Sequence, residues 1–198
     1  MTDLKPVLAV DVDEVLYPLV QLFVEYHNNN HDTDAVFEQF YSYSFEKSLG
    51  LPKDKFIERI ASFAEQGNFA SKDPIEGTKI AIAELSKHYD LQIVTSRWES
   101  WQQHTITWLQ SHFPDTFSEV HFANSIPWQR GEEYSKLAIC KRIGAQYFID
   151  DSLENATDVA AGGIKSFLFG DYPWNQTAKL PENVSRVKDW NEVLEILL

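Results

Sequence analysis

Acidic, hydroxyl and lysine side chains follow short apolar runs at several points of this sequence. Each run ends at a polar residue, as a buried parallel strand does where it reaches the active edge of a sheet. The side chains concerned are Asp11, Asp13, Thr95, Ser96, Lys136, Asp150 and Asp151. Because ligands of open α/β sheets collect at the carboxyl ends of the strands, we expect these side chains to converge on one crevice.

Four carboxylates in one crevice require a compensating cation. Carboxylates that lie close together cannot all stay ionised without nearby positive charge. Hard oxygen ligands with few nitrogen or sulfur donors favour Mg²⁺ over softer metals. We therefore predict a magnesium site formed by Asp11, Asp13, Asp150 and Asp151.

A site of this kind suits phosphoryl transfer to a carboxylate. Asp11 would attack phosphorus and form an aspartyl-phosphate, which divides one difficult hydrolysis into two easier displacements. Asp13 would protonate the leaving alkoxide and then accept a proton from the attacking water. The Thr95 hydroxyl, the Ser96 amide and the Lys136 ammonium would bind the phosphoryl oxygens.

The apolar runs and the patterns between them predict an α/β fold. We expect strands at 7–10, 91–94, 147–149 and 165–169, with a weaker candidate at 120–123. Helical patterns lie between them at 79–88, 101–112 and 135–143, and Gly144 would end the last of these helices. Strands that alternate with helices indicate a doubly wound parallel sheet.

The segment from about residue 17 to residue 74 interrupts this alternation. It shows helical periodicity and many aromatic residues but no convincing strand. We expect helices at 20–28, 34–40 and 53–66, separated by an irregular stretch at 41–45. The prediction is a catalytic core of residues 1–16 and 75–198, with residues 17–74 inserted as a small helical cap.

These motifs together resemble the haloacid dehalogenase superfamily over nearly the whole chain. The resemblance depends on Asp-Val-Asp-Glu-Val-Leu after the first strand, Thr-Ser after the second, a lysine before the last helix, and Ile-Asp-Asp-Ser. The cap position and the Pro-Ile-Glu-Gly sequence at 74–77 look like the 5′(3′)-deoxyribonucleotidase family, cytosolic and mitochondrial.

The resemblance implies roles for the acidic residues. Asp11 would be the nucleophile of a Mg²⁺-dependent phosphatase with a HAD-like, Rossmannoid fold, and Asp13 the acid and base. The Asp13 carbonyl would also bind the metal, Asp151 would be a direct ligand, and Asp150 would lie in the outer shell. Many relatives have glycine where this chain has Glu14, so the turn after Asp13 is expected to be more polar or more restricted here.

Asp13 also distinguishes branches of the superfamily. Dehalogenating members lack this second acid, whereas phosphatases and mutases need it. P-type ATPase relatives carry Lys-Thr-Gly-Thr after the nucleophile, and this chain does not. The resemblance therefore favours a phosphate monoester, with a nucleoside monophosphate as the first choice of substrate.

Several candidate residues also have ordinary structural interpretations. Asp150, Asp151 and Ser152 precede Leu153 in a pattern that is typical of a helix N-cap. Lys141 or Lys165 could take the role given to Lys136.

Arg97 and the aromatic residues leave further alternatives open. Arg97 could reach a second substrate group or pair with Glu99. The aromatic residues of the insertion are expected to form its own core, and Phe45 is the first candidate if one of them stacks on a substrate base. A turn-rich loop with Trp174 and Asn175 could border the site or fold over a sheet edge.

Other functions are compatible with the same acidic residues. A sugar-phosphate phosphatase or phosphomutase would use the same chemistry, and a non-catalytic relative would retain the pocket and bind phosphate or metal. A receiver domain also combines acids, a hydroxyl residue and a lysine. Receivers place their acidic pair first, whereas here Asp150 and Asp151 come last.

Composition narrows the class of partner. The chain has 198 residues, 43% of them hydrophobic, so one domain with an insertion can bury a full core. A formal net charge of −13 disfavours binding to nucleic-acid polymers and anionic membranes. Cys140 is the single cysteine, which excludes an internal disulfide. No signal-peptide pattern or bilayer-length apolar run is evident, so we expect a cytoplasmic protein that acts on a small phosphate ester.

Overall fold

The centre of the molecule is a six-stranded sheet in which every strand pair is parallel. The computed structural model describes residues 5–67, 72–123 and 132–198. The strands are β1 (Val7–Val10), β2 (Asp90–Thr95), β3 (Glu119–Phe122), β4 (Ala145–Asp150), β5 (Lys165–Phe169) and β6 (Val184–Val187). Their order is β3-β2-β1-β4-β5-β6. The chain therefore winds outward on both sides of β1, which places a topological switch point beside this central strand.

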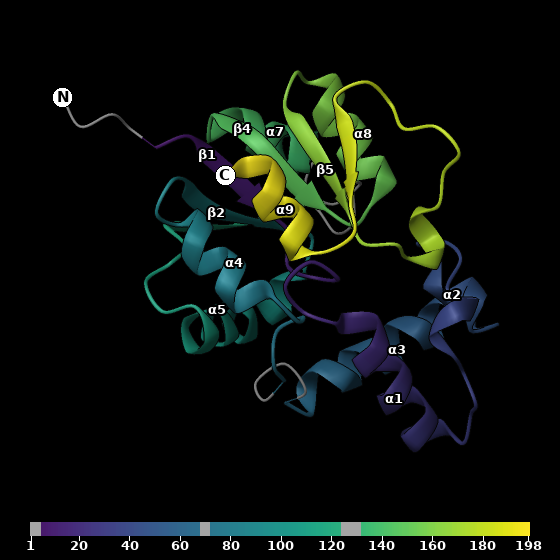
Figure 1. Cartoon of the computed structure of the whole chain (residues 1–198). Helices are drawn as coiled ribbons and strands as arrows, with labels where there is room; N and C mark the ends of the chain where they lie inside the picture. Colours follow the sequence, from purple (N-terminus) through teal and green to yellow (C-terminus); the bar gives the residue numbers. More distant parts are fainter. Residues whose placement is uncertain (1–4, 68–71, 124–131) are drawn as a thin grey trace.

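Helices cover both faces of the sheet (Figure 1). On one face lie α4 (Thr78–Leu85), α5 (Gln102–His112) and α9 (Trp190–Leu197), and on the other lie α7 (Lys136–Arg142) and α8 (Leu153–Ala161). Successive residues of β1 face opposite sides of the sheet and therefore pack into two different layers of the core. Leu8 and Val10 pack with the first group, and Ala9 packs with the second. The predicted doubly wound α/β fold is confirmed.

A further group of α-helices lies beside the carboxyl ends of the strands (Figure 1). These are α1 (Leu19–His31), α2 (Phe45–Ser48) and α3 (Lys53–Glu65), which all fall between β1 and α4 in the chain. Phe23 on α1 meets Phe63 on α3 edge to face, with ring centroids 5.8 Å apart. This aromatic pair belongs to a buried apolar cluster that also includes Leu22 of α1 and Ile60 of α3.

One predicted helix of this segment is wrong. Residues 34–40 contain only a short 3₁₀ turn, η1 (Phe37–Gln39). The Asn28 side chain donates to the Ala35 carbonyl at 2.8 Å and accepts from the Ala35 amide at 2.9 Å. These bonds hold the chain in an extended form, and Val36 continues it with φ −123° and ψ 152°. Local side-chain bonds thus replace the helical ones.

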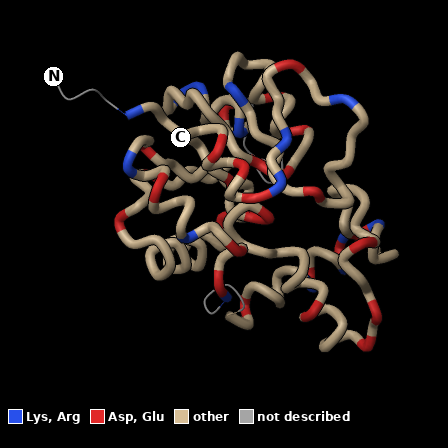
Figure 2. Tube along the Cα trace, viewed as in Figure 1, with Lys and Arg blue, Asp and Glu red and all other residues tan. Residues whose placement is uncertain are grey.

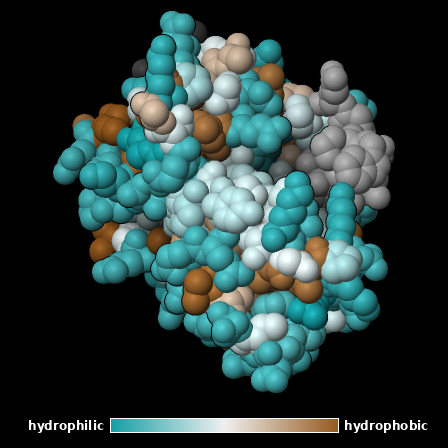
Figure 3. Space-filling view, turned by 90° about the vertical axis from the view of Figure 1, so that its right-hand side faces the viewer, coloured by the Kyte–Doolittle hydropathy of each residue, from teal (hydrophilic) through white to brown (hydrophobic). Residues whose placement is uncertain are grey.

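One face of the molecule is mainly polar. Figure 3 shows mostly hydrophilic residues on one face, with small and separate apolar areas. In Figure 2, several acidic positions lie at the centre of the trace, where the sheet faces α1 and α3. Among the described residues, no helix has both the length and the apolar content to cross a bilayer.

Candidate active site

Asp11, Asp150 and Asp151 form a compact cluster of carboxylates at the end of two adjacent strands. Asp11 follows β1 directly, and Asp150 is the last residue of the neighbouring β4. One carboxylate oxygen from each of the three residues lies within 4.8 Å of the others. Asp150 is fully buried, and the other two are at most 6% exposed. Burial of three acids this close creates a strong demand for positive charge.

Lys136 supplies part of that charge. Its Nζ lies 2.8 Å from Asp11 Oδ2 and 2.6 Å from Asp150 Oδ2, and its side chain is only 4% exposed. Lys136 is the first residue of α7, where the Ser135 hydroxyl caps the helix by accepting from the Ala138 amide at 3.1 Å. The structure thus brings together Lys136 with two of the predicted acids.

The protonation equilibria reflect this crowding. Burial raises the pKa of Asp11 to about 7, although the Lys136 ammonium acts in the opposite direction. Burial raises the pKa of Asp151 well above its usual range, and repulsion from Asp150 and Asp11 raises it further. Burial acts to lower the pKa of Lys136, but Asp11 and Asp150 together raise it above its ordinary value. One lysine therefore only partly compensates the three acids.

The start of α8 lies directly beside the acidic cluster. Ser152 is the N-cap of α8, because its hydroxyl accepts from the Asn155 amide at 3.3 Å. Asp150 Oδ1 accepts from the Ser152 amide at 2.8 Å and from Asn155 Nδ2 at 3.2 Å. Asp150 Oδ2 faces Lys136. Asp150 thus supports the start of α8 and the acidic cluster at once.

Asp13 lies apart from this cluster and binds Arg97. Arg97 Nη2 donates to Asp13 Oδ1 at 2.6 Å, and Nε lies 3.0 Å and 3.1 Å from the two carboxylate oxygens. Arg97 is fully buried at its side chain, whereas the Asp13 side chain is 23% exposed. The guanidinium also donates to Thr105 at 3.2 Å and lies 4.7 Å from the centre of the Tyr17 ring. The planar guanidinium, which donates through both Nε and Nη2, therefore fixes the plane of the Asp13 carboxylate.

Thr95 and Ser96 lie at the same edge of the sheet as Asp11. The β1–β2 register pairs Val10 with Ile93, so that Asp11 and Thr95 both extend toward the carboxyl end. Thr95 is buried, and its hydroxyl accepts from the Arg97 amide at 3.3 Å. Ser96 is partly buried.

Phe45 belongs to an aromatic group between the helical segment and the loop after β5. Its ring centroid lies 5.4 Å from that of Phe40 and 5.9 Å from that of Trp174. Tyr43 stacks on Phe45 at 5.9 Å. The role of Phe45 toward a substrate base stays a prediction.

Two residues outside the predicted set bind Asp151. The Tyr43 hydroxyl donates to Asp151 Oδ2 at 2.6 Å, and Trp174 Nε1 donates to the same oxygen at 2.8 Å. Asn175 donates to the Asp151 carbonyl at 3.1 Å. The turn-rich sequence after β5 indicated that Trp174 and Asn175 could border the site, but no local signal pointed to the Tyr43 hydroxyl.

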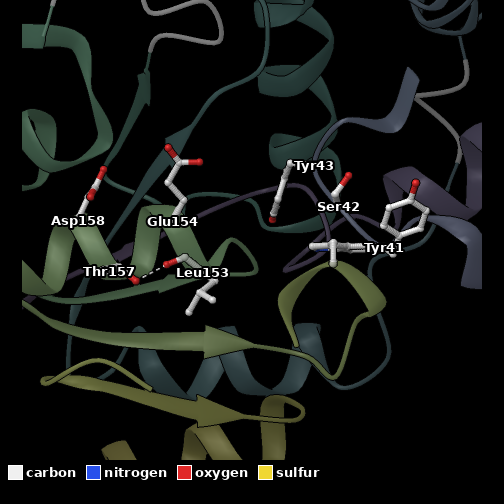
Figure 4. A pocket seen from close by; sticks show the side chains of 8 residues that line it. Tyr41, Ser42, Tyr43, Leu153, Glu154, Thr157 and Asp158 are labelled. Carbon is white, nitrogen blue, oxygen red and sulfur yellow. Dashed lines mark hydrogen bonds between the residues drawn. The ribbon is translucent and has the colours of Figure 1, made fainter. Parts of the chain in front are cut away.

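A surface pocket adjoins this contact (Figure 4). It has a volume of about 440 Å³ and lies between residues 41–43 and α8. Its lining combines aromatic, hydroxyl and acidic side chains: Tyr41, Ser42, Tyr43, Leu153, Glu154, Thr157, Asp158 and Trp174. Tyr43 and Trp174 therefore face both this pocket and the acidic cluster.

Comparison with protein families agrees with the geometry. The model of the family described as "5' nucleotidase, deoxy (Pyrimidine), cytosolic type C protein" matches residues 5–198. The chain belongs to this family. It is accordingly a phosphoric monoester hydrolase of the HAD superfamily.

Solved structures share the fold of this nucleotidase-family chain at low sequence identity. A haloacid dehalogenase-like hydrolase from Streptococcus pneumoniae has a TM-score of 0.70 at 15% identity, and the match covers 100% of both chains. YfnB from Bacillus subtilis, assigned as a HAD-hydrolase and solved with magnesium bound, has a TM-score of 0.64 at 14% identity. That match covers 98% of this chain and 99% of YfnB. No curated protein matches the sequence.

A turn that favours glycine is occupied by Glu14 in this member of the family. Glu14 has φ +57°, in the left-handed region that glycine adopts most readily. Its Oε1 accepts from the Val20 amide at 2.6 Å, near the start of α1, and burial raises its pKa to about 8. The expected polar turn is present, and its side chain ties the turn to the helical segment.

The acidic cluster fits a divalent cation. It offers three carboxylates and a single lysine, which matches the hard oxygen ligands that Mg²⁺ prefers. The raised pKa values of Asp11 and Asp151 indicate negative charge that a bound cation would stabilise.

Proposed function

We propose that this chain hydrolyses a deoxyribonucleoside monophosphate with Mg²⁺ through an aspartyl-phosphate on Asp11. The observation that carries the proposal is the contact of Lys136 with Asp11 and Asp150, beside Asp151, at the end of the two central strands. Membership of the nucleotidase family supports the choice of substrate class. When bound, Mg²⁺ would neutralise charge between the carboxylates and the phosphoryl oxygens.

The first chemical step forms the covalent intermediate. A carboxylate oxygen of Asp11 attacks phosphorus, and the bond between phosphorus and the ester oxygen breaks. Asp13 donates a proton to the leaving oxygen, so that the nucleoside departs as an alcohol. Arg97 positions the Asp13 carboxylate through a bidentate contact, in which Nε and Nη2 both donate hydrogen bonds.

The second step consumes one water molecule. Asp13 accepts a proton from this water as the oxygen attacks phosphorus, and the bond from phosphorus to Asp11 breaks. Inorganic phosphate leaves, and Asp11 and Asp13 return to their starting states. The net reaction converts one ester and one water into one alcohol and one phosphate.

Residues at the same edge would bind the phosphoryl group and the cation. Thr95, Ser96 and Lys136 would contact its oxygens, where charge is redistributed in the transition state. Asp11, Asp150, Asp151 and the carbonyl of Asp13 would hold Mg²⁺. We also propose that residues 17–74 act as a cap, with Phe45 the first candidate to stack on the base.

A substrate panel tests this proposal. Phosphate release would be measured for deoxyribonucleoside, ribonucleoside and sugar monophosphates, each with Mg²⁺ and with EDTA. We expect Mg²⁺-dependent release, fastest from a deoxyribonucleoside monophosphate. Faster release from sugar phosphates would contradict the substrate class, and no release from any ester would indicate a binding protein that has lost turnover.

A further inference from the structure

Asp151 differs from the other acids of the cluster in its surroundings. Asp11 and Asp150 contact the Lys136 ammonium, whereas the Asp151 carboxylate accepts from Tyr43 and Trp174. Both hydrogen bonds reach Oδ2, and Oδ1 receives neither of them. Two donors on one oxygen fix the rotation of the carboxylate plane.

The two donors come from different parts of the molecule. Trp174 lies in η4 (Pro173–Asn175), the next element after β5, and Asn175 in the same turn donates to the Asp151 carbonyl. Tyr43 is 108 positions away from Asp151 in the sequence and belongs to the helical segment between β1 and α4. The helical segment therefore contacts Asp151 directly.

Packing holds the Tyr43 hydroxyl in place. The Tyr43 ring lies against Phe45 at 5.9 Å and Trp174 at 6.3 Å, and Phe45 contacts Trp174 at 5.9 Å. From this position the Tyr43 hydroxyl donates to Asp151 Oδ2 at 2.6 Å. Displacement of the aromatic group would thus remove a donor from Asp151.

We propose that Tyr43 is a positioning residue, which orients Asp151 for a divalent cation and couples the placement of the helical segment to cation binding. The inference rests on the proposed magnesium site. Hydrogen-bond partners that orient a metal ligand are typically worth about 10-fold to 100-fold in metal affinity. Coupling of this kind is reciprocal, so a bound cation must also stabilise the position of the segment.

A second explanation is that Tyr43 only docks the helical segment on the core. Under this explanation, loss of the hydroxyl would lower stability equally with and without Mg²⁺, and cation affinity would not change. Cation affinity measured without substrate therefore separates the two roles.

The experiment is titration calorimetry of the full chain with MgCl₂, without substrate. The Tyr43→Phe variant retains the ring and loses the donor. Tyr41→Phe is the matched control, because Tyr41 lies in the same segment, lines the same pocket and is 66% exposed. We expect Tyr43→Phe to weaken Mg²⁺ binding about 10-fold and Tyr41→Phe to change it less than about twofold.

Amide hydrogen exchange supplies a second readout. We expect Mg²⁺ to slow exchange in residues 37–48 of the wild type and to have a smaller effect in Tyr43→Phe. Trp174→Phe removes the other donor and should also weaken Mg²⁺ binding. Since both donors act on one oxygen, the effects in the double variant should not add.

The outcomes are distinguishable. Wild-type protein that binds no Mg²⁺ would overturn the proposed function and this inference together. If the wild type binds Mg²⁺ and Tyr43→Phe binds it with the same affinity, the inference is overturned but the proposed function is not. If Tyr41→Phe loses as much Mg²⁺ affinity as Tyr43→Phe, the effect comes from the segment in general and not from the Tyr43 hydroxyl, and the inference is overturned.

Discussion

The strand ends of the core and the helical segment contribute to the acidic cluster in different ways. Asp11, Asp150 and Lys136 are all supplied by the core, in contacts of 2.6–2.8 Å. The helical segment touches the cluster through the Tyr43 hydroxyl, backed by aromatic packing. The core therefore assembles these charged groups without the segment, and in our proposal the segment orients only the Asp151 carboxylate. Substitutions in the core should abolish the reaction, whereas substitutions in the segment should modulate binding.

Substitution of Asp11, the proposed nucleophile, should have the largest effect. Asp11→Asn removes the attacking carboxylate but also relieves repulsion among the acids, so the fold should be retained. We expect kcat to fall by at least about a thousandfold. Phosphate release and circular dichroism check this, with exposed Asp171→Asn as control. Substantial residual turnover would show that another group attacks phosphorus.

Removal of the cluster's lysine should affect both activity and stability. Lys136→Met leaves Asp11 and Asp150 buried without their ammonium, and breaking a buried pair of this kind costs about 3–5 kcal/mol. Loss of the donor that we propose for the phosphoryl oxygens should also lower kcat by about 10²–10³. Urea unfolding should show a destabilisation that Mg²⁺ partly reverses. Unchanged stability without Mg²⁺ would contradict the account of the cluster.

Disruption of the Arg97 fork should have an intermediate effect. Arg97→Gln leaves Asp13 without its guanidinium, so proton transfer should suffer more than substrate binding. We expect kcat to fall about 10-fold to 100-fold, with a smaller change in KM. Arg97→Lys keeps the charge but loses the fork, and it should recover only part of the loss. A large rise in KM with normal kcat would instead indicate that Arg97 binds the substrate.

The helical segment should show the smallest effect, through His27. Burial lowers the pKa of His27 to about 4, and the charges of Arg59 and His31 act in the same direction. In the unfolded chain His27 binds a proton as the pH falls below about 6.5, whereas in the folded protein it does so only near pH 4. The unfolding free energy should therefore decrease as pH falls through this window. Urea unfolding of His27→Gln should depend less on pH than the wild type, while exposed His88→Gln should behave like the wild type.

Sequence patterns sufficed for the central strands because those strands are buried on both faces. The runs at 7–10 and 165–169 coincide with β1 and β5. At one edge of the sheet, where β3 is only partly buried, the weaker pattern at 120–123 is displaced by one residue from the strand. β6 was not predicted, because Val184–Val187 is short and carries Ser185 and Arg186 between its two valines. The sequence did contain an N-cap signal for α9, because Asp189 caps this helix by accepting from the Asn191 and Glu192 amides.

The contacts among site residues were harder to predict than their positions in the chain. The order of strands brings Asp11 beside Asp150, and this follows from the parallel sheet alone. The pairing of Arg97 with Asp13 and of Tyr43 with Asp151 depends on how side chains pack between distant segments. Spacing along the chain contains no information on such pairs, which is why Arg97 had two other candidate partners and Tyr43 had none.

The most direct test of the central claim is a thermal unfolding measurement with beryllium trifluoride, which mimics a phosphoryl group on a carboxylate. We predict that Mg²⁺ and beryllium trifluoride together raise the Tm of the wild type by several degrees more than either reagent alone, because they occupy the site at Asp11. Asp11→Asn should show no such combined shift. Absence of the shift in the wild type, or an equal shift in Asp11→Asn, would contradict a preformed phosphoryl-transfer site at the end of β1.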